Sequence, residues 1–298
     1  MKPVSSMRSM PLSRRAFIRG GARVALLSST FGASALLSAC GGAGDDQSVT
    51  ETPKLSTVEN FRDVAAGMGE GYPTVDGARL RRGVFYRSGA LTPDDADAAA
   101  LARLSLSAVH DLRVVGEASL APDRVPSGAV RETHEIAPID VAAAAPADAA
   151  AASAWIVERQ RQLVTDPVAR LQFGLLLTRL ARVSGTQVIH GTAGKDRTGW
   201  AAALLLSIAD VPLDVIIQDY LLTNTVAQTQ IDARMTAHAT RLGTDTQTVA
   251  PLYQAQGATI EAAFDEMHRE YGTLSRYLAQ GLSMTSADVA MLRAKLIA

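Results

Sequence analysis

The most informative stretch of the chain is His190-Gly191-Thr192-Ala193-Gly194-Lys195-Asp196-Arg197-Thr198-Gly199. Residues 187–190 have the composition of a short buried strand, and residues 198–208 have the pattern of an apolar helix. A short glycine-containing loop at a helix N-terminus turns several backbone N–H groups toward one point, where the helix dipole adds positive charge. Lys195 and Arg197 add two full charges. The stretch therefore predicts a binding site for a phosphate dianion.

A nucleotide-binding Walker loop is the other common phosphate loop between a strand and a helix. In this register it requires glycine at position 189 and serine or threonine at position 196. The chain has Ile189 and Asp196 there, so the sequence excludes a Walker loop.

Outward from this loop, strand patterns alternate with helix patterns. Short strands are predicted at residues 82–87, 107–113, 130–137 and 187–190. Helices are predicted to begin at Thr92 and Asp166 and to cover residues 198–208, 213–223, 226–240, 257–271 and 285–296. The alanine-rich residues 141–154 are predicted to form a mobile helix or lid. The order predicts an α/β fold with a mainly parallel central sheet flanked by helices and a helical C-terminal part.

The composition is that of a soluble globular protein, with 298 residues of which 47% are hydrophobic and 20% charged. The single cysteine, Cys40, excludes an internal disulfide and a cysteine-based zinc cluster. The remaining histidines lack the sequence spacing of metal ligands, and we expect neither a metal nor a cofactor; they are His110, His134, His238 and His268.

The formal net charge of −1 conceals an asymmetry. Six of the 29 Lys and Arg residues lie within residues 1–39, which contain no Asp or Glu. The other 23 face 30 acidic residues, so the rest of the chain carries −7. A body this acidic is not expected to bind nucleic acid through its general field.

The first 54 residues resemble a bacterial export signal followed by a tether. Residues 13–19, Ser-Arg-Arg-Ala-Phe-Ile-Arg, resemble the twin-arginine signal, and residues 24–39 are uncharged. Leu37-Ser38-Ala39-Cys40 resembles the lipobox of lipoproteins, in which the cysteine is lipidated. The resemblance implies a signal peptide at 1–39, a lipidated tether at 40–54 and a folded domain at 55–298. It also implies export and a lipid anchor at Cys40 in the cell envelope, facing the periplasm.

The 190–199 loop closely resembles the signature of cysteine-dependent protein tyrosine phosphatases. It is most similar to a bacterial tyrosine/serine and phosphoinositide phosphatase family whose loop reads HCTAGKDRTG. Other family-like motifs follow in the family order, namely Asn60–Asp63, Tyr86–Gly89, Asp111–Arg113 and Asp219–Asn224. The resemblance covers about residues 55–298 and implies a tyrosine-phosphatase-like fold.

The resemblance implies a role for each loop residue. Arg197 would clamp two phosphate oxygens, and Asp196 matches the proposed general acid. Lys195 and Asp111 match a lysine and an aspartate that orient each other and the phosphate, and His190 would support the loop. The phosphate-binding set would be Thr192, Ala193, Gly194, Lys195, Asp196, Arg197 and Thr198. The chain departs from the family at one position, because Gly191 stands where the nucleophilic cysteine belongs.

Glycine has no side chain to attack phosphorus, and the mature chain would hold no other free thiol. The sequence therefore predicts a protein that binds phosphotyrosine, phosphoserine or phosphoinositide groups on a protein, peptide or lipid with little or no turnover. The alternative is an active phosphatase, through a water-based route with Asp196 as base or because residue 191 is natively cysteine. Gly191 itself has three possible origins, which are a natural loss, an engineered change and a sequence error.

Overall fold

The computed structural model describes residues 51–67 and 69–298. The predicted signal peptide, the lipidation at Cys40 and most of the predicted tether lie outside these residues. None of the described helices combines the length and apolar character that crossing a bilayer requires.

The centre of the fold is a five-stranded sheet in the order β1-β2-β5-β3-β4. Its strands are β1 (Arg62–Asp63), β2 (Phe85–Ser88), β3 (Leu106–Asp111), β4 (Val130–Thr133) and β5 (Thr186–His190). Strand β1 pairs antiparallel with β2, and the other neighbours are parallel. The predicted mainly parallel α/β sheet is confirmed. The last residue of β5, His190, therefore ends at the same sheet edge as Asp111 of β3 and Ser88 of β2.

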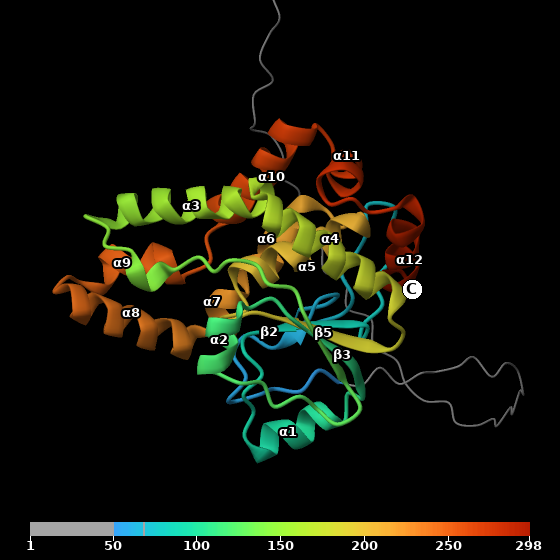
Figure 1. The fold of residues 1–298 in the computed structure, drawn as a ribbon, viewed down its shortest axis with the longest axis horizontal. Coiled ribbons are helices and arrows are strands. Elements are labelled where there is room, and N and C mark those ends of the chain that lie inside the picture. Colours follow the sequence, from blue (N-terminus) through green and yellow to red (C-terminus); the bar gives the residue numbers. More distant parts are fainter. Residues whose placement is uncertain (1–50, 68) are drawn as a thin grey trace, which may run out of the picture. The chain divides into compact units, whose positions relative to one another are not determined.

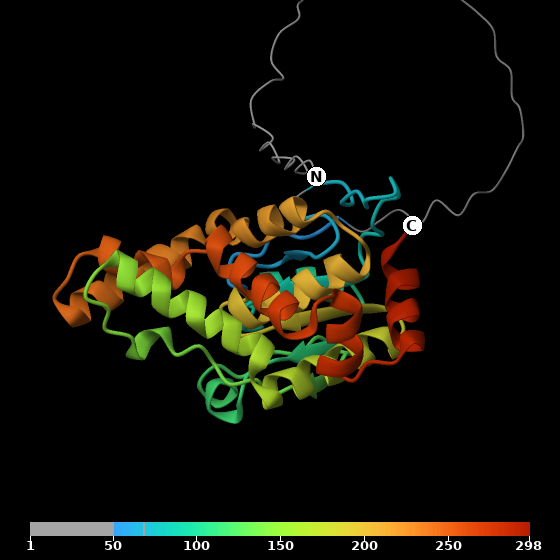
Figure 2. The same ribbon diagram turned by 90° about the horizontal axis from the view of Figure 1, so that it is seen from above.

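Helices cover both faces of this sheet (Figures 1 and 2). The α-helices are α1 (Asp95–Ala102), α2 (Val115–Leu120), α3 (Ala149–Thr165), α4 (Pro167–Arg182), α5 (Asp196–Ile208), α6 (Leu213–Leu221), α7 (Thr223–Val226), α8 (Gln228–Leu242), α9 (Thr246–Tyr253), α10 (Gly257–Tyr271), α11 (Leu274–Arg276) and α12 (Ser286–Leu296). A 3-10 turn, η1, covers Val141–Ala143, and a π-helical turn, η2, covers Tyr277–Gly281.

The alternation of side chains along the strands explains the two-faced packing. On β5, Val188 faces one side, where it packs in a cluster with Leu101 of α1. Its neighbour Ile189 faces the other side, in the larger core that holds α5. Trp200 in α5 is fully buried, so this helix is the central helix of that core.

A separate hydrophobic cluster joins α3, α8 and α9, which extend together beyond the sheet in both views (Figures 1 and 2). Ala152 and Ile156 of α3 are fully buried against Val249 and Leu252 of α9. The predicted alanine-rich segment thus forms η1 and the first turns of α3. These turns of α3 pack against α9. Its action as a lid stays a prediction.

Several element boundaries differ from the sequence prediction. Helix α1 begins two residues later than predicted, because Asp94 rather than Thr92 caps it and accepts a hydrogen bond from the N–H of Asp97. The predicted strand at 130–137 ends at Thr133. Helix α9 was not predicted, since Pro251 lies inside it. The helix starting at Asp166 and the helix at 257–271 are confirmed.

Candidate functional site

The 190–198 loop leaves the carboxyl end of β5, in the middle of the sheet, and leads into α5 at Asp196. Groups outside the loop hold its carbonyl oxygens. The side chain of Asn60 donates to the carbonyl oxygen of Gly194 at 2.8 Å, and Arg87 donates to the same oxygen at 2.9 Å. The N–H of Ala90 donates to the carbonyl oxygen of Thr192 at 3.1 Å. The N–H of Gly191 donates to the carbonyl oxygen of Ser88 at 3.4 Å, and we expect the N–H groups of the following residues to face the concave side of the loop.

Gly194 permits this turn. Its φ of +67° lies in the left-handed region, and an added Cβ would lie 2.5 Å from the backbone of Ser88. A larger residue would be strained there and would push the loop away from β2.

A buried ion-pair network lies beneath the loop. Asp219 of α6 lies between Arg87 on β2, at 2.9 Å, and Arg62 on β1, at 3.4 Å. All three side chains are at most 2% exposed. Asn60 and Arg87 thus connect this network to the loop, and the sequence motifs that contain them fix the loop's shape rather than react.

Position 191 faces a single hydroxyl group. An added Cβ at Gly191 would lie 3.1 Å from the Oγ1 atom of Thr198, and the φ of Gly191 lies outside the left-handed region. The Thr198 hydroxyl is buried and has no hydrogen-bond partner among the described residues. A side chain at 191 would therefore meet a hydroxyl donor that is otherwise unused.

Arg197 lies deep in the loop, and a carboxylate already occupies its guanidinium fork. Its Nη1 atom donates to the carbonyl oxygens of Ile136 at 2.9 Å and Leu112 at 3.2 Å. Both terminal nitrogens donate to Glu117 of α2, at 2.8 and 2.6 Å. Burial raises the pKa of Glu117, but the hydrogen bonds and charge of Arg197 outweigh it and hold the pKa below its usual value of 4.5. Such a bidentate pair has the geometry in which arginine also binds two phosphate oxygens.

Lys195 and Asp196 contact each other within the loop, with 3.4 Å between Nζ and Oδ1. The Lys195 ammonium also donates to the carbonyl oxygen of Leu252 in α9, at 2.8 Å. Burial lowers the pKa of Lys195, although the nearby Asp196 opposes this. The Tyr220 hydroxyl donates to Asp196 at 3.5 Å.

The expected contact between Lys195 and Asp111 is wrong. Asp111 is fully buried at the end of β3, where Arg113 and Arg131 bind its carboxylate at 2.9 and 2.5 Å. Asp111 does not line the cavity that lies above the loop. The sheet register places Asp111 beside His190, and the ring of His190 lies 3.2 Å from Asp123. Asp111 and His190 therefore support the loop from below.

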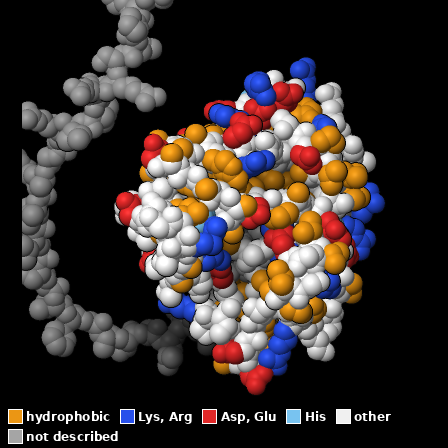
Figure 3. Space-filling model, turned by 60° about the vertical axis from the view of Figure 1, so that its left-hand side comes forward, with side chains coloured by type: hydrophobic (Ala, Val, Ile, Leu, Met, Phe, Trp, Pro, Cys, Tyr) orange, Lys and Arg blue, Asp and Glu red, His pale blue; other side chains and the backbone are white. Residues whose placement is uncertain are grey.

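A cavity of about 470 Å³ opens above the loop. Residues 191–198 form its floor, and its walls are largely apolar, including Leu120, Ile139, Ile231, Leu252 and Tyr253. Arg234 of α8 also lines it and is paired in bidentate fashion with Glu59. Figure 3, which brings the side of α8 and α9 forward, shows hydrophobic side chains gathered among scattered charged groups on this face. The size and lining suit a phosphate group attached to an apolar body.

Five of these charged residues were not predicted from the sequence, namely Glu59, Glu117, Asp123, Arg131 and Arg234. Glu117 follows the Asp111–Arg113 motif by four residues, and this short spacing could have suggested that it reaches the same site. Glu59 directly precedes the Asn60–Asp63 motif and could have been suspected in the same way. Asp123 and Arg234 gave no local signal, because only the fold brings them to the loop.

The chain is similar in sequence to named phosphatases over most of its length. A family model described as "Tyrosine phosphatase family" matches residues 53–298. A protein of Cupriavidus necator named a tyrosine-protein phosphatase is 32% identical over 254 residues, which cover 82% of this chain and 88% of that protein. The triple specificity protein phosphatase PtpB of Mycobacterium tuberculosis is 30% identical over 272 residues, which cover 77% of this chain and 94% of PtpB.

Among solved structures, TpbA of P. aeruginosa in complex with phosphotyrosine is 15% identical. The alignment covers 63% of this chain and 89% of TpbA, with a TM-score of 0.26, which is too low to compare the two folds.

Proposed function

Because the chain belongs to the tyrosine phosphatase family, we propose that it binds phosphorylated ligands at the 190–198 loop and turns them over slowly or not at all. The observation that carries this proposal is the combination at one site of an intact Arg197 fork with a glycine at position 191. The binding machinery of the loop is present, and the nucleophile is absent.

The oxygens of a bound phosphate group would accept hydrogen bonds from two sets of donors. The free N–H groups of the loop and the N-terminus of α5 would bind one side of the group. The Arg197 fork would bind two further oxygens, in the position that the Glu117 carboxylate now occupies. Ligand binding therefore requires Glu117 to move, and α2 has no buried residue that would hold the helix in place.

The chemical step that the family performs needs a thiolate at position 191. The thiolate attacks phosphorus, the alcohol leaves with a proton from the general acid, and water then cleaves the phosphocysteine. In this chain the only cysteine is Cys40, for which we propose a lipid anchor. Loss of a covalent nucleophile lowers the rate by several orders of magnitude, and binding and electrostatic stabilisation alone sustain only a small residual rate.

The ligand class follows from the walls of the cavity. An apolar wall beside a phosphate site favours phosphotyrosine, phosphoserine in a peptide, or a phosphoinositide head group with its apolar tail nearby. The sequence similarity to a protein named a triple specificity protein phosphatase supports protein phosphoesters within this set.

The second candidate function is phosphomonoester hydrolysis. The unused Thr198 hydroxyl beside position 191 favours it, because that hydroxyl would stabilise a cysteine thiolate if the native residue were cysteine. A water activated by Asp196 is the other route to the same activity.

The binding proposal is tested by titrating the full-length chain with a phosphotyrosine peptide in a calorimeter. We expect saturable binding that the unphosphorylated peptide does not show and that Arg197→Ala abolishes. Equal binding by Arg197→Ala, at unchanged far-ultraviolet circular dichroism, would refute the site.

We also propose the cellular location that the N-terminal sequence implies. The chain would be exported through its twin-arginine-like signal and held by a lipid at Cys40 on the periplasmic side of the envelope. Its ligands would then be phosphoesters that reach that compartment.

A further inference from the structure

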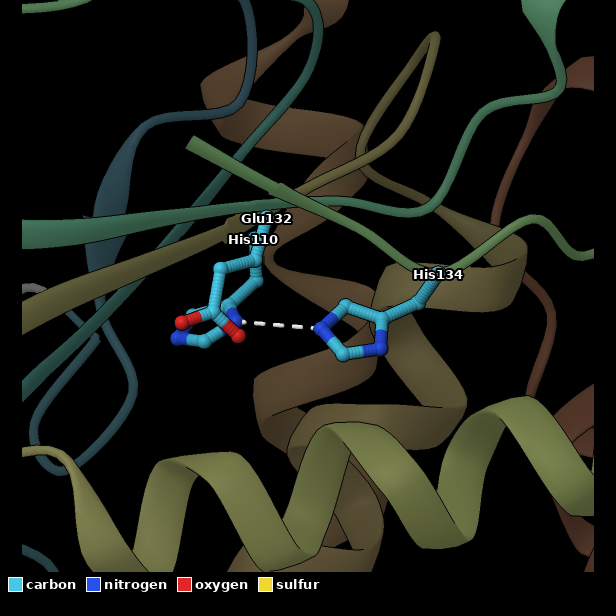
Figure 4. A group of neighbouring side chains, drawn as sticks. All are labelled: His110, Glu132 and His134. Carbon is cyan, nitrogen blue, oxygen red and sulfur yellow. Dashed lines mark hydrogen bonds between the residues drawn. The ribbon is translucent and has the colours of Figure 1, made fainter. Parts of the chain in front are cut away.

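Three side chains with metal-ligating atoms converge on one face of the sheet, away from the 190–198 loop. His110 of β3 and Glu132 of β4 are paired in the parallel register, so their side chains point to the same face. His134 lies two residues beyond Glu132, and the two-residue repeat of a strand turns it to that face as well. Figure 4 shows the rings of His110 and His134 pointing toward one another in front of the sheet, with Glu132 beside them.

The distances among these groups are those of a coordination site. His110 Nδ1 lies 3.2 Å from His134 Nε2. One carboxylate oxygen of Glu132 joins them, and the three atoms all lie within 4.8 Å of one another. His110 is fully buried and His134 is 4% exposed.

The tautomer of His110 is fixed by a buried amide. The Gln187 side-chain nitrogen donates to the carbonyl oxygens of Leu180 and Val183. Its oxygen therefore faces the His110 Nε2 atom, at 2.9 Å, and can only accept a hydrogen bond. His110 must carry its proton on Nε2, which leaves a bare lone pair on Nδ1 directed at His134.

We propose that His110 Nδ1, His134 Nε2 and a Glu132 oxygen form a binding site for a divalent transition-metal ion such as Zn²⁺. Zinc takes imidazole nitrogens at about 2.0–2.1 Å in a tetrahedron, which separates two nitrogens by about 3.3 Å. The observed separation of 3.2 Å is close to this value. The two atoms form a hydrogen bond in which His134 Nε2 donates to His110 Nδ1, so metal binding would require His134 to carry its proton on Nδ1 instead. Gln187 is the outer partner that holds a ligating histidine in the correct tautomer. Two imidazoles and one carboxylate would leave the fourth position to water.

A second group of similar composition is not proposed as a metal site. It consists of Asp111, Asp123 and His190. Arg113 and Arg131 bind both of its carboxylates, so its negative charge is already neutralised. In the proposed site, Arg179 also pairs with Glu132 and donates to its two carboxylate oxygens at 2.7 and 2.5 Å. This pair differs from those of the second group because the Arg179 side chain is 49% exposed, so it can release one carboxylate oxygen to a metal at little cost.

The metal would hold strand β4, at the sheet edge, to β3. It would also fix the chain just before Ile136, whose carbonyl oxygen anchors Arg197. The site is outside the cavity, since none of its three ligands lines that cavity. Its role would be to stabilise this edge of the fold and the seat of Arg197.

The test uses the full-length chain with Cys40→Ser, because a thiol also binds zinc. The protein is stripped with a chelator and titrated with ZnCl₂ while the thermal unfolding midpoint is followed. We expect one tight equivalent and a higher midpoint, because the native state alone holds the preformed site. With Co²⁺ in place of Zn²⁺, the visible absorption of a tetrahedral complex should appear at one equivalent.

Three variants locate the ligands. His134→Asn and Glu132→Gln should each weaken Zn²⁺ binding by about 100-fold or more, and Gln187→Met by about 10–100-fold. The matched control, His268→Asn, changes an exposed histidine on α10 and should bind as the parent does. Glu132 is partly exposed, so Glu132→Gln should keep the circular dichroism of the parent even if His134→Asn does not.

The proposal fails if the parent chain takes up no tight equivalent of Zn²⁺. It also fails if Glu132→Gln and His134→Asn, both folded, bind Zn²⁺ as tightly as the parent does.

Discussion

At the scale of single residues, the pair that distinguishes this site is Thr198 and Gly191. The Thr198 hydroxyl is buried without a hydrogen-bond partner among the described residues, and it faces the position where Gly191 has no side chain. A buried hydroxyl without a partner costs about 1–3 kcal/mol. The site therefore keeps a donor that a thiolate at position 191 would use.

Glu117 occupies the Arg197 fork and would therefore compete with the proposed phosphate ligand. We predict that Glu117→Gln tightens the binding of a phosphotyrosine peptide by about tenfold, or about 1.4 kcal/mol. The reason is that one negative charge leaves the site while the packing of α2 is kept. Calorimetric titration measures the change.

The matched control for this variant is Glu261→Gln, an identical charge change at an exposed position on α10. Its affinity should equal that of the parent chain. Weaker binding by Glu117→Gln than by this control would mean that Glu117 supports the ligand rather than competing with it.

Residue-level prediction from the sequence succeeded where the residues are adjacent in the chain. Gly194, Lys195, Asp196 and Arg197 lie in one loop because they are consecutive. It failed for the contact between Lys195 and Asp111, because the ammonium instead meets the carbonyl oxygen of Leu252. It also treated His110 and His134 as unrelated, although the register of β3 with β4 brings their rings together.

At the scale of elements, the helices were predictable where a capping residue or a regular apolar stripe marks them. Asp166 followed by Pro167 marked the start of α4, and the apolar spacing of residues 257–271 marked α10. Helix α9 has an internal proline and packs on α3 and α8, so its stability comes from tertiary contacts. The site residues that depend on α9 could not be predicted for the same reason.

The contact of the last helix, α12, with α4 can be tested by measuring stability at different pH values. Asp288 near the start of α12 accepts hydrogen bonds from Arg182 of α4 and from Thr285, and these hold its pKa below the usual 3.8. A depressed carboxyl pKa contributes stability above about pH 3.8, and this is lost as the pH falls through the folded-state value.

We therefore predict that Asp288→Asn lowers the free energy of unfolding at pH 7 by about 1 kcal/mol, since Arg182 is largely exposed. The difference from the parent should shrink as the pH falls below about 3.8. Urea unfolding at pH 7 and pH 3 measures it, with the exposed Asp265→Asn as control. A difference of the same size at both pH values would contradict the assignment.

At the scale of the whole molecule, the proposed phosphate site lies in a body with an overall negative charge. Residues 40–298 carry −7, so the general field repels a phosphorylated ligand. Attraction has to come from Arg197, Lys195 and the loop N–H groups at short range. This is why whole-chain charge excluded nucleic acid but could not identify the ligand.

The proposed lipid anchor at Cys40 concerns the whole chain. We predict that Cys40→Ala moves the protein from the membrane fraction to the soluble fraction of the periplasm, because the lipid attachment is lost. Fractionation and immunoblotting of the producing bacterium measure this, with the unmodified chain in parallel. Retention of Cys40→Ala in the membrane fraction would show that another segment holds the protein.

The central claim is that this chain has the phosphate site of its family and lacks only the nucleophile. The most direct measurement compares turnover of a small aryl phosphate by the full-length chain, by Gly191→Cys, and by Gly191→Cys combined with Arg197→Ala. We predict no turnover by the unmodified chain above its own Arg197→Ala variant, and an increase of several orders of magnitude in Gly191→Cys that Arg197→Ala removes. Turnover by the unmodified chain that depends on Arg197, or a folded Gly191→Cys without activity, would contradict the claim.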